Sequence, residues 1–185
     1  NPPLKLTEIW NYSETSGKNA SWTSDKAAIR NMCYGNGKLF VVKPSAAEIL
    51  VVDARTAQQV GTVNTTGIEG GTLKVMDVQF VNGKLLATNL ATATSPILKV
   101  YVWNDGYDAA PSELLNTTDL AGFSRIGDTF SVKGDLTSGE LLYAAGSTSE
   151  ENKIVKYAIS NGVASATPTT IVITEGTEGI KLGSS

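Results

Sequence analysis

The chain has 185 residues, 41% of them hydrophobic, and a formal net charge of -3. This length supports one domain with a sizeable core, and no apolar run approaches the ~18 residues of a membrane-spanning helix. The near balance of 15 basic and 18 acidic residues excludes a broad basic surface for a nucleic-acid backbone. We therefore expect no nucleic-acid partner and no transmembrane segment.

The composition also limits the chemistry of the chain. It contains no histidine, which removes the commonest general base and metal ligand. Cys33 is the single cysteine, so neither an internal disulfide nor a thiolate zinc cluster can form. We expect a buried, inert thiol at Cys33, and we assign no catalytic residue, metal or cofactor.

Strands rather than helices are predicted along the chain. Apolar residues come in runs of four to six between Gly, Asn, Thr and Ser, and none keeps the i, i+3, i+4, i+7 spacing of a helix through two turns. The first predicted strands are "LTEIWN" (6–11) and "ASWT" (20–23). We interpret residues 1–28 as the end of a repeated unit.

From residue 29 the predicted strands recur four at a time. Each unit has a strand of alternating apolar residues, a tight turn with an apolar strand, and two further strands; the Asn-Gly turns at 36–37 and 82–83 are strong hairpin signals. The first unit, 29–73, has strands around Met32 and Tyr34 and at 36–42, 48–53 and 59–63. The second, 74–124, has strands at 76–80, 82–88, 98–103 and 112–116. The third, 125–175, has strands around Ile126, Phe130 and Val132 and at 138–144, 153–158 and 169–173.

Four short strands repeated every ~40–50 residues are typical of a propeller blade. The sequence thus predicts one all-β domain over 1–185, a β-propeller of about three and a half four-stranded blades. A blade cannot bury both of its faces alone. Three completions stay open: a larger propeller of which this is a part, self-association of two chains through unpaired blade faces, or a small four-bladed disc. A sandwich with another strand order is a further alternative.

Five residues are candidate ligand-binding positions. Arg125 and Asp128 in "RIGDTFSVKGD" either pair to hold a loop or line the centre of the propeller. Asp77 lies near the start of an inner strand and is expected to anchor a loop. Trp22 and Tyr107 occupy loop-like surroundings and offer aromatic faces to a ligand.

Other distinctive residues are given structural roles. Asp53 follows a predicted strand, where an Asp side chain accepts backbone N–H groups in a turn. Trp10, Trp103 and Tyr157 fall at equivalent strand positions and are expected to pack between units.

The stretch from Leu39 to Val63 resembles the repeat of YVTN-type and quinoprotein-like propellers, through Val51, Val52, Asp53, Thr56, Val60 and Val63. The motifs "GIEGGTLKVMDV", "ATNLATATSPILKVYVWND" and "RIGDTFSVKGDL" are similar to an uncharacterised family of secreted β-propeller-like proteins of Bacteroidetes, a domain of unknown function, over about residues 10–175. This resemblance implies export to the periplasm or cell surface, where many relatives are lipoproteins. It transfers no activity, and the quinone cofactor of quinoproteins does not carry over.

We expect a non-catalytic binding or scaffold module of the bacterial cell envelope, with a protein or a glycan as its ligand. The alternative is a hydrolase or lyase acting on polysaccharide through carboxylates near the propeller centre. That chemistry needs two carboxylates within ~5–9.5 Å, and Asp77 and Asp128 are the candidates.

Overall fold

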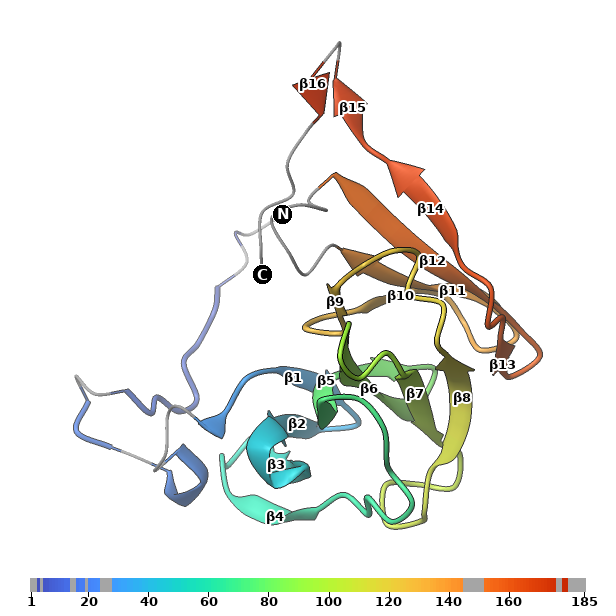
Figure 1. Ribbon diagram of the computed structural model, residues 1–185. Coiled ribbons are helices and arrows are strands. Elements are labelled where there is room, and N and C mark those ends of the chain that lie inside the picture. Colours follow the sequence, from blue (N-terminus) through green and yellow to red (C-terminus); the bar gives the residue numbers. More distant parts are fainter. Residues whose placement is uncertain are drawn as a thin grey trace.

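The computed structural model is an all-β protein with three antiparallel sheets of four or five strands (Figure 1). It describes residues 3, 5–13, 16–18, 20–23, 28–144, 152–175 and 178–179. Helix within these residues is confined to short 3-10 turns, such as η1 (Ser21–Thr23) and η3 (Pro44–Ala46). In the part of the chain so described, no helix has the length and apolar character needed to cross a membrane.

The first sheet is a four-stranded meander in the order β1-β2-β3-β4. Its strands are β1 (Met32–Gly35), β2 (Lys38–Lys43), β3 (Glu48–Asp53) and β4 (Gln59–Thr62). Asn36 and Gly37 join β1 to β2 with φ of 48° and 75°. Positive φ at both central residues is the geometry of the tight turns that match strand twist, which Asn-Gly adopts readily.

The second sheet repeats this order as β5-β6-β7-β8. Its strands are β5 (Leu73–Val81), β6 (Lys84–Thr92), β7 (Leu98–Trp103) and β8 (Ser112–Thr117). Asn82 and Gly83 form the corresponding turn with φ of 47° and 80°. A two-residue strand, β9 (Arg125–Ile126), pairs with the far end of β6.

The third sheet has the order β10-β11-β12-β13, and β14 also pairs with β12. Its strands are β10 (Ser131–Gly134), β11 (Ser138–Ala144), β12 (Lys153–Ser160), β13 (Val163–Ala164) and β14 (Thr169–Val172). A short hairpin of β15 (Thr174–Glu175) and β16 (Glu178–Gly179) follows. In Figure 1 the three sheets succeed one another in chain order, from blue through green to orange.

The structure corrects the predicted strands at the N-terminus. Residues 6–11 form no strand, and residues 21–23 form a 3-10 turn. Side chains hold this segment to the first sheet instead, because the indole N–H groups of Trp10 and Trp22 donate to the carbonyls of Ala54 and Ala57, each at 2.8 Å. Instead of the two predicted strands, the N-terminal segment thus contacts the loop after β3 through its tryptophans.

The third unit also differs from its prediction. Ile126 lies in β9 and pairs with Ala91 of the second sheet rather than opening the third. Phe130 lies between β9 and β10, and its ring is buried. The sequence reading also missed β13, which closes on β12 through a third Asn-Gly turn at Asn161 and Gly162.

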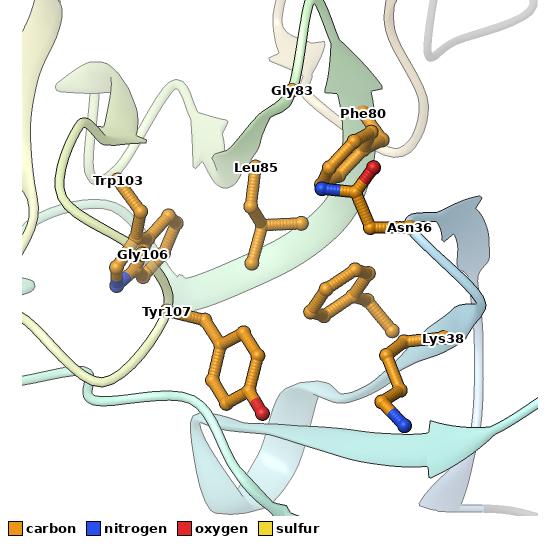
Figure 2. A pocket seen from close by; sticks show the side chains of 9 residues that line it. Asn36, Lys38, Phe80, Gly83, Leu85, Trp103, Gly106 and Tyr107 are labelled. Atoms are coloured by element: carbon orange, nitrogen blue, oxygen red, sulfur yellow. The ribbon is translucent and has the colours of Figure 1, made fainter.

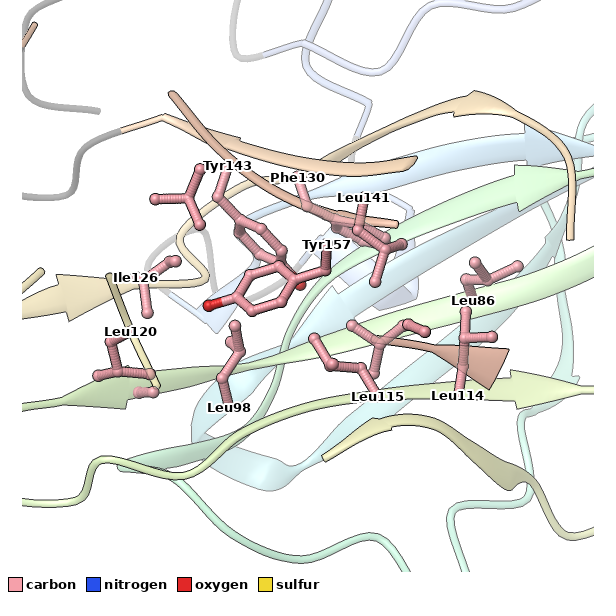
Figure 3. Close-up of a cluster of buried hydrophobic side chains, with 14 of the residues drawn as sticks. Leu86, Leu98, Leu114, Leu115, Leu120, Ile126, Phe130, Leu141, Tyr143 and Tyr157 are labelled. Carbon is pink, nitrogen blue, oxygen red and sulfur yellow. The ribbon is translucent and has the colours of Figure 1, made fainter. Parts of the chain in front are cut away.

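Two apolar cores join the three sheets. One lies between the first and second sheets and includes Phe40, Val51, Val78 and Trp103. The other lies between the second and third sheets, where leucines from β6, β7 and β8 meet Phe130, Tyr143 and Tyr157 (Figure 3). Trp103 and Tyr157 are almost fully buried in these cores, as their equivalent positions predict, whereas Trp10 is only half-buried.

The outward faces of the first and third sheets are covered by other residues to different extents. On the first sheet Val41, Leu50 and Val52 form a small cluster under Trp22 and Ile29, while Met32 and Tyr34 stay exposed. On the third sheet Leu142 and Ile154 are half-buried, and Ile171 and Val172 of β14 are exposed. Apolar side chains are therefore left on both outward sides of the stack.

Candidate functional site

An aromatic pocket of about 230 Å³ opens between the first and second sheets (Figure 2). It is lined by Asn36, Lys38, Phe40, Phe80, Gly83, Leu85, Trp103, Gly106 and Tyr107. These residues come from the equivalent ends of both sheets: the turns after β1 and β5, the starts of β2 and β6, and the loop after β7. The pocket therefore exists only because two repeated units pack face to face.

Three aromatic rings in contact with one another line this pocket. The rings of Phe40 and Phe80 stack with centroids 5.7 Å apart and planes 10° apart. Tyr107 meets Phe40 edge to face, with centroids 5.8 Å apart. Both distances lie in the range where aromatic pairs attract one another beyond simple burial of area. This contact holds the Tyr107 ring at the pocket although its backbone belongs to a loop.

Gly35 makes room for the Phe80 ring. A Cβ atom at Gly35 would lie 2.1 Å from Cγ of Phe80, far inside any van der Waals contact. The ring therefore rests directly on the backbone at the end of β1. A glycine in a strand interior often marks such a close approach, and here the approach couples the first sheet to the second.

Most polar groups at the pocket already have protein partners. The indole N–H of Trp103 donates to the carbonyl of Asn64 at 2.9 Å. Lys38 Nζ lies 2.9 Å from Oδ2 of Asp53. Among the residues that the structure describes, the side-chain amide of Asn36 and the hydroxyl of Tyr107 have no hydrogen-bond partner. These two groups are available to a ligand.

Asp53 forms the turn expected from the sequence. Its Oδ1 accepts hydrogen bonds from the backbone N–H groups of Arg55 at 3.0 Å and Thr56 at 3.1 Å. The hydrogen bond from Lys38, followed by these backbone bonds, lowers the pKa of Asp53 to about 2. The carboxylate is thus ionised at neutral pH and balances the charge of Lys38 beside the pocket.

Of the two aromatic candidates from the sequence, the structure places only Tyr107 at this pocket. Trp22 lies on the opposite face of the first sheet, against Val41, Leu50 and Val52. It borders a separate hollow of about 160 Å³ with mainly polar neighbours, among them Lys43 and Glu48. Its indole N–H is already used by a backbone carbonyl, so Trp22 has the contacts of a cover for the first sheet.

Asp77 lies in β5 and binds the loop that leads into the third sheet. Its Oδ2 accepts hydrogen bonds from Thr129 Oγ1 at 3.0 Å and from the backbone N–H of Phe130 at 2.9 Å. Asp77 as a whole residue is 3% exposed, and burial raises the pKa of its carboxyl despite these hydrogen bonds. Asp77 therefore connects two sheets, in the position that the sequence reading proposed for a loop anchor.

Arg125 of β9 pairs with Asp128 in the loop that follows this strand. The guanidinium of Arg125 donates from Nε to Oδ2 of Asp128 at 2.6 Å and from Nη2 to Oδ1. The amide of Asn31 donates to the backbone carbonyl of Asp128 at 2.9 Å and to that of Met76 at 3.0 Å. The loop is thus held from both other sheets.

The structure does not bring the five candidates into one site. Tyr107 lines the inter-sheet pocket, Trp22 covers the outer face of the first sheet, and Asp77, Arg125 and Asp128 cluster around the loop before β10. Within the described ranges no group of three or more Asp, Glu or Cys side chains is arranged to hold a metal ion.

Sequence reasoning missed Phe40, Phe80 and Leu85 as pocket residues. A signal was present, because both "NGK" turns (36–38 and 82–84) bring flanking apolar residues to the same end of consecutive sheets. The sequence pattern did not indicate that the two units would face each other across a pocket.

These features define a class of protein: repeated antiparallel meanders stacked face to face, with an aromatic pocket between the first two. A family model described as "Domain of unknown function (DUF4623)" matches residues 5–181, and the chain belongs to that family. The crystal structure of a DUF4623 family protein from Bacteroides eggerthii is similar to this chain, with a TM-score of 0.65 and 18% identity. The match covers 78% of this chain and 35% of the other, so this chain spans about a third of that protein's length. No curated protein matches the chain.

Proposed function

We propose that the chain is a non-catalytic binding module of the bacterial cell envelope, and that its ligand, a protein or a glycan, occupies the aromatic pocket between the first two sheets. The observation that carries this proposal is the pocket itself: Leu85 and several aromatic side chains line it, and the Asn36 amide and Tyr107 hydroxyl find no hydrogen-bond partner in the described part of the chain. Binding sites are typically concave and mostly apolar, with a few polar groups that orient the ligand.

In this proposal the three sheets are consecutive blades of a β-propeller. Three features support it: each sheet is a meander in chain order, adjacent sheets share a core, and the units recur at the period of a blade. The apolar residues on the outer faces, such as Tyr34 and Ile171, would then meet further blades or a second copy of the chain. Pairing of such faces is how repeat proteins bury a continuous core.

The contacts of the acidic candidates support a non-catalytic role. The carboxylate of Asp77 is engaged by Thr129 and Phe130, and that of Asp128 by Arg125. The raised pKa of Asp77 is what a general acid needs, and this observation keeps a polysaccharide hydrolase or lyase as the alternative. However, the buried carboxylate of Asp77 accepts three hydrogen bonds from its own chain, including one from the backbone N–H of Val78, and must break them to reach a substrate.

An extracytoplasmic location completes the proposal. It is supported by the resemblance of the motifs in residues 10–175 to exported proteins of Bacteroidetes.

The experiment is a binding screen of the 185-residue chain against a glycan array and a peptide array. Ligands that the wild type retains are measured again with Tyr107→Ala and with the matched control Tyr34→Ala, which removes an exposed tyrosine from the far side of the first sheet. We expect Tyr107→Ala to weaken binding at least ~10-fold, as for an aromatic anchor, and Tyr34→Ala to leave it unchanged. Equal binding by the wild type and Tyr107→Ala would refute the assignment of the pocket.

A further inference from the structure

We infer that the aromatic pocket receives one uncharged aromatic or branched aliphatic side chain of a protein ligand, and that Asn36 binds the backbone of that ligand beside it. This inference rests on the proposed function and specifies its ligand.

The size of the pocket corresponds to one such side chain. An apolar protein cavity of about 150 Å³ accommodates a benzene ring, and the pocket measures about 230 Å³. It therefore has room for one ring or one branched chain with its Cβ. Several sugar units in a row would need a longer platform, whereas a single anchoring side chain fills a pocket of this volume.

The polarity of the walls distinguishes a side chain from a sugar ring. A sugar carries hydroxyl groups around its edge, and each buried without a partner costs roughly 1–3 kcal/mol. Inside the pocket Phe40, Leu85 and the ring of Trp103 offer no free donor or acceptor, because the Trp103 N–H is already bonded to Asn64. A hydrocarbon side chain makes no such demand.

Charge at the pocket favours an uncharged guest. The one cation among the lining residues, Lys38, is neutralised by Asp53 at 2.9 Å. A positive or a negative group on a ligand would meet no unpaired opposite charge among the lining residues, and burying a charge without a partner is costly. This excludes Lys, Arg, Asp and Glu as the inserted side chain.

The unpaired polar groups have the chemistry of a peptide partner. The side chain of Asn36 carries both a donor and an acceptor, which together match the C=O and N–H of a peptide group. Figure 2 shows Asn36 and Phe80 on one side of the pocket and Trp103 and Tyr107 on the other. A side chain inserted between them brings its own backbone next to the Asn36 amide, and a ring with a polar tip can also reach the Tyr107 hydroxyl.

The test is a titration of the ¹⁵N-labelled 185-residue chain, followed by NMR, with N-acetyl-phenylalaninamide, N-acetyl-leucinamide, N-acetyl-alaninamide and methyl glucopyranoside. We expect the first two probes to shift the signals of Gly83, Gly106 and the Asn36 side chain with a Kd of about 1 mM, as for a fragment of this size. We expect alaninamide to bind at least ~10-fold more weakly, and the glucoside to shift none of these signals.

Two variants separate the ring contact from the backbone contact. Asn36→Gly removes the side-chain amide and keeps the positive φ of the turn. It should weaken the binding of N-acetyl-phenylalaninamide about fivefold. The binding of toluene, which has no peptide group, should stay unchanged. Tyr107→Ala should weaken the binding of both N-acetyl-phenylalaninamide and toluene, and Tyr34→Ala should change the binding of neither.

The outcomes separate this inference from the proposed function. If the glucoside shifts the pocket signals and the amides do not, the pocket binds a glycan, and the inference falls while the proposed function stands. If no probe shifts them, both fall. If Asn36→Gly and Tyr107→Ala bind the amides as tightly as the wild type does, the amides bind elsewhere on the protein, and the inference is also overturned.

Discussion

Replacing Asp77 by Ala should separate the second sheet from the loop that enters the third. The substitution removes the acceptor for Thr129 Oγ1 and for the backbone N–H of Phe130, and the latter group is buried. Hydrogen bonds to a charged acceptor contribute about 1.5–3 kcal/mol each. Part of this is offset because the raised pKa of Asp77 shows that burial disfavours its charged form. We expect a net loss of about 2–4 kcal/mol in the free energy of unfolding.

The measurement is urea unfolding at neutral pH, supported by the melting temperature. For a chain of this length such a loss lowers Tm by roughly 4–16 °C. Asp105→Ala is the matched control, because Asp105 is exposed and surface substitutions usually change stability by less than about 0.5 kcal/mol. A loss in Asp77→Ala no greater than in Asp105→Ala would refute the anchoring role.

Asp77→Asn adds a dependence on pH. The folded state of the wild type binds the proton of Asp77 more tightly than the unfolded chain, since the pKa is raised above the ordinary value of 3.8. Wild-type stability should therefore fall relative to Asp77→Asn as the pH rises through 3.8 and above. Unfolding curves of both proteins between pH 3.5 and about 7 check this; a constant difference between them would contradict it.

Three further changes test the packing around the pocket and in the cores. Gly35→Ala should displace the ring of Phe80 and lower stability by about 1–3 kcal/mol in thermal unfolding, whereas Gly61→Ala, where a Cβ meets nothing within 4 Å, should be nearly neutral; equal effects would refute the close approach. The thiol of Cys33, whose pKa burial raises to about 12, should react with iodoacetamide at pH 8 at least about a hundredfold more slowly than in the urea-unfolded chain. Its rate should keep rising above pH 10, and a plateau near pH 9 would contradict the raised pKa. Tyr143→Phe removes a buried hydroxyl bonded to a threonine at 2.9 Å and should cost about 1 kcal/mol in urea unfolding; unchanged stability would show that this bond contributes nothing.

Local patterns were sufficient for most strands. The strands predicted at 48–53, 98–103 and 138–144 coincide with β3, β7 and β11. Each combines apolar, often β-branched residues with a turn at one end, and these preferences act between near neighbours in the chain. The Asn-Gly turns at 36–37 and 82–83 were predictable for the same reason, since few other pairs adopt positive φ twice in succession.

The elements that were predicted wrongly depend on contacts between residues far apart in the chain. Trp10 and Trp22 were predicted in strands, but the structure attaches both to the first sheet through their side chains, because each indole N–H donates to a carbonyl 44 or 35 residues away. Ile126 was assigned to the third unit, but it pairs with Ala91 because β6 continues to Thr92, beyond Leu85–Thr88 that pair with β7.

Local patterns in the sequence were enough to predict an all-β chain with strands in repeated groups of four, and turns at Asp53 and at the Asn-Gly pairs. These properties follow from side-chain alternation and turn chemistry within a few residues. The packing of the sheets, in contrast, is what brings Phe40, Phe80 and Tyr107 to one pocket and lets Asp77 link two sheets through hydrogen bonds. Those features depend on which face of one sheet packs against the next, and that choice is made by the combined burial of many side chains far apart in the chain.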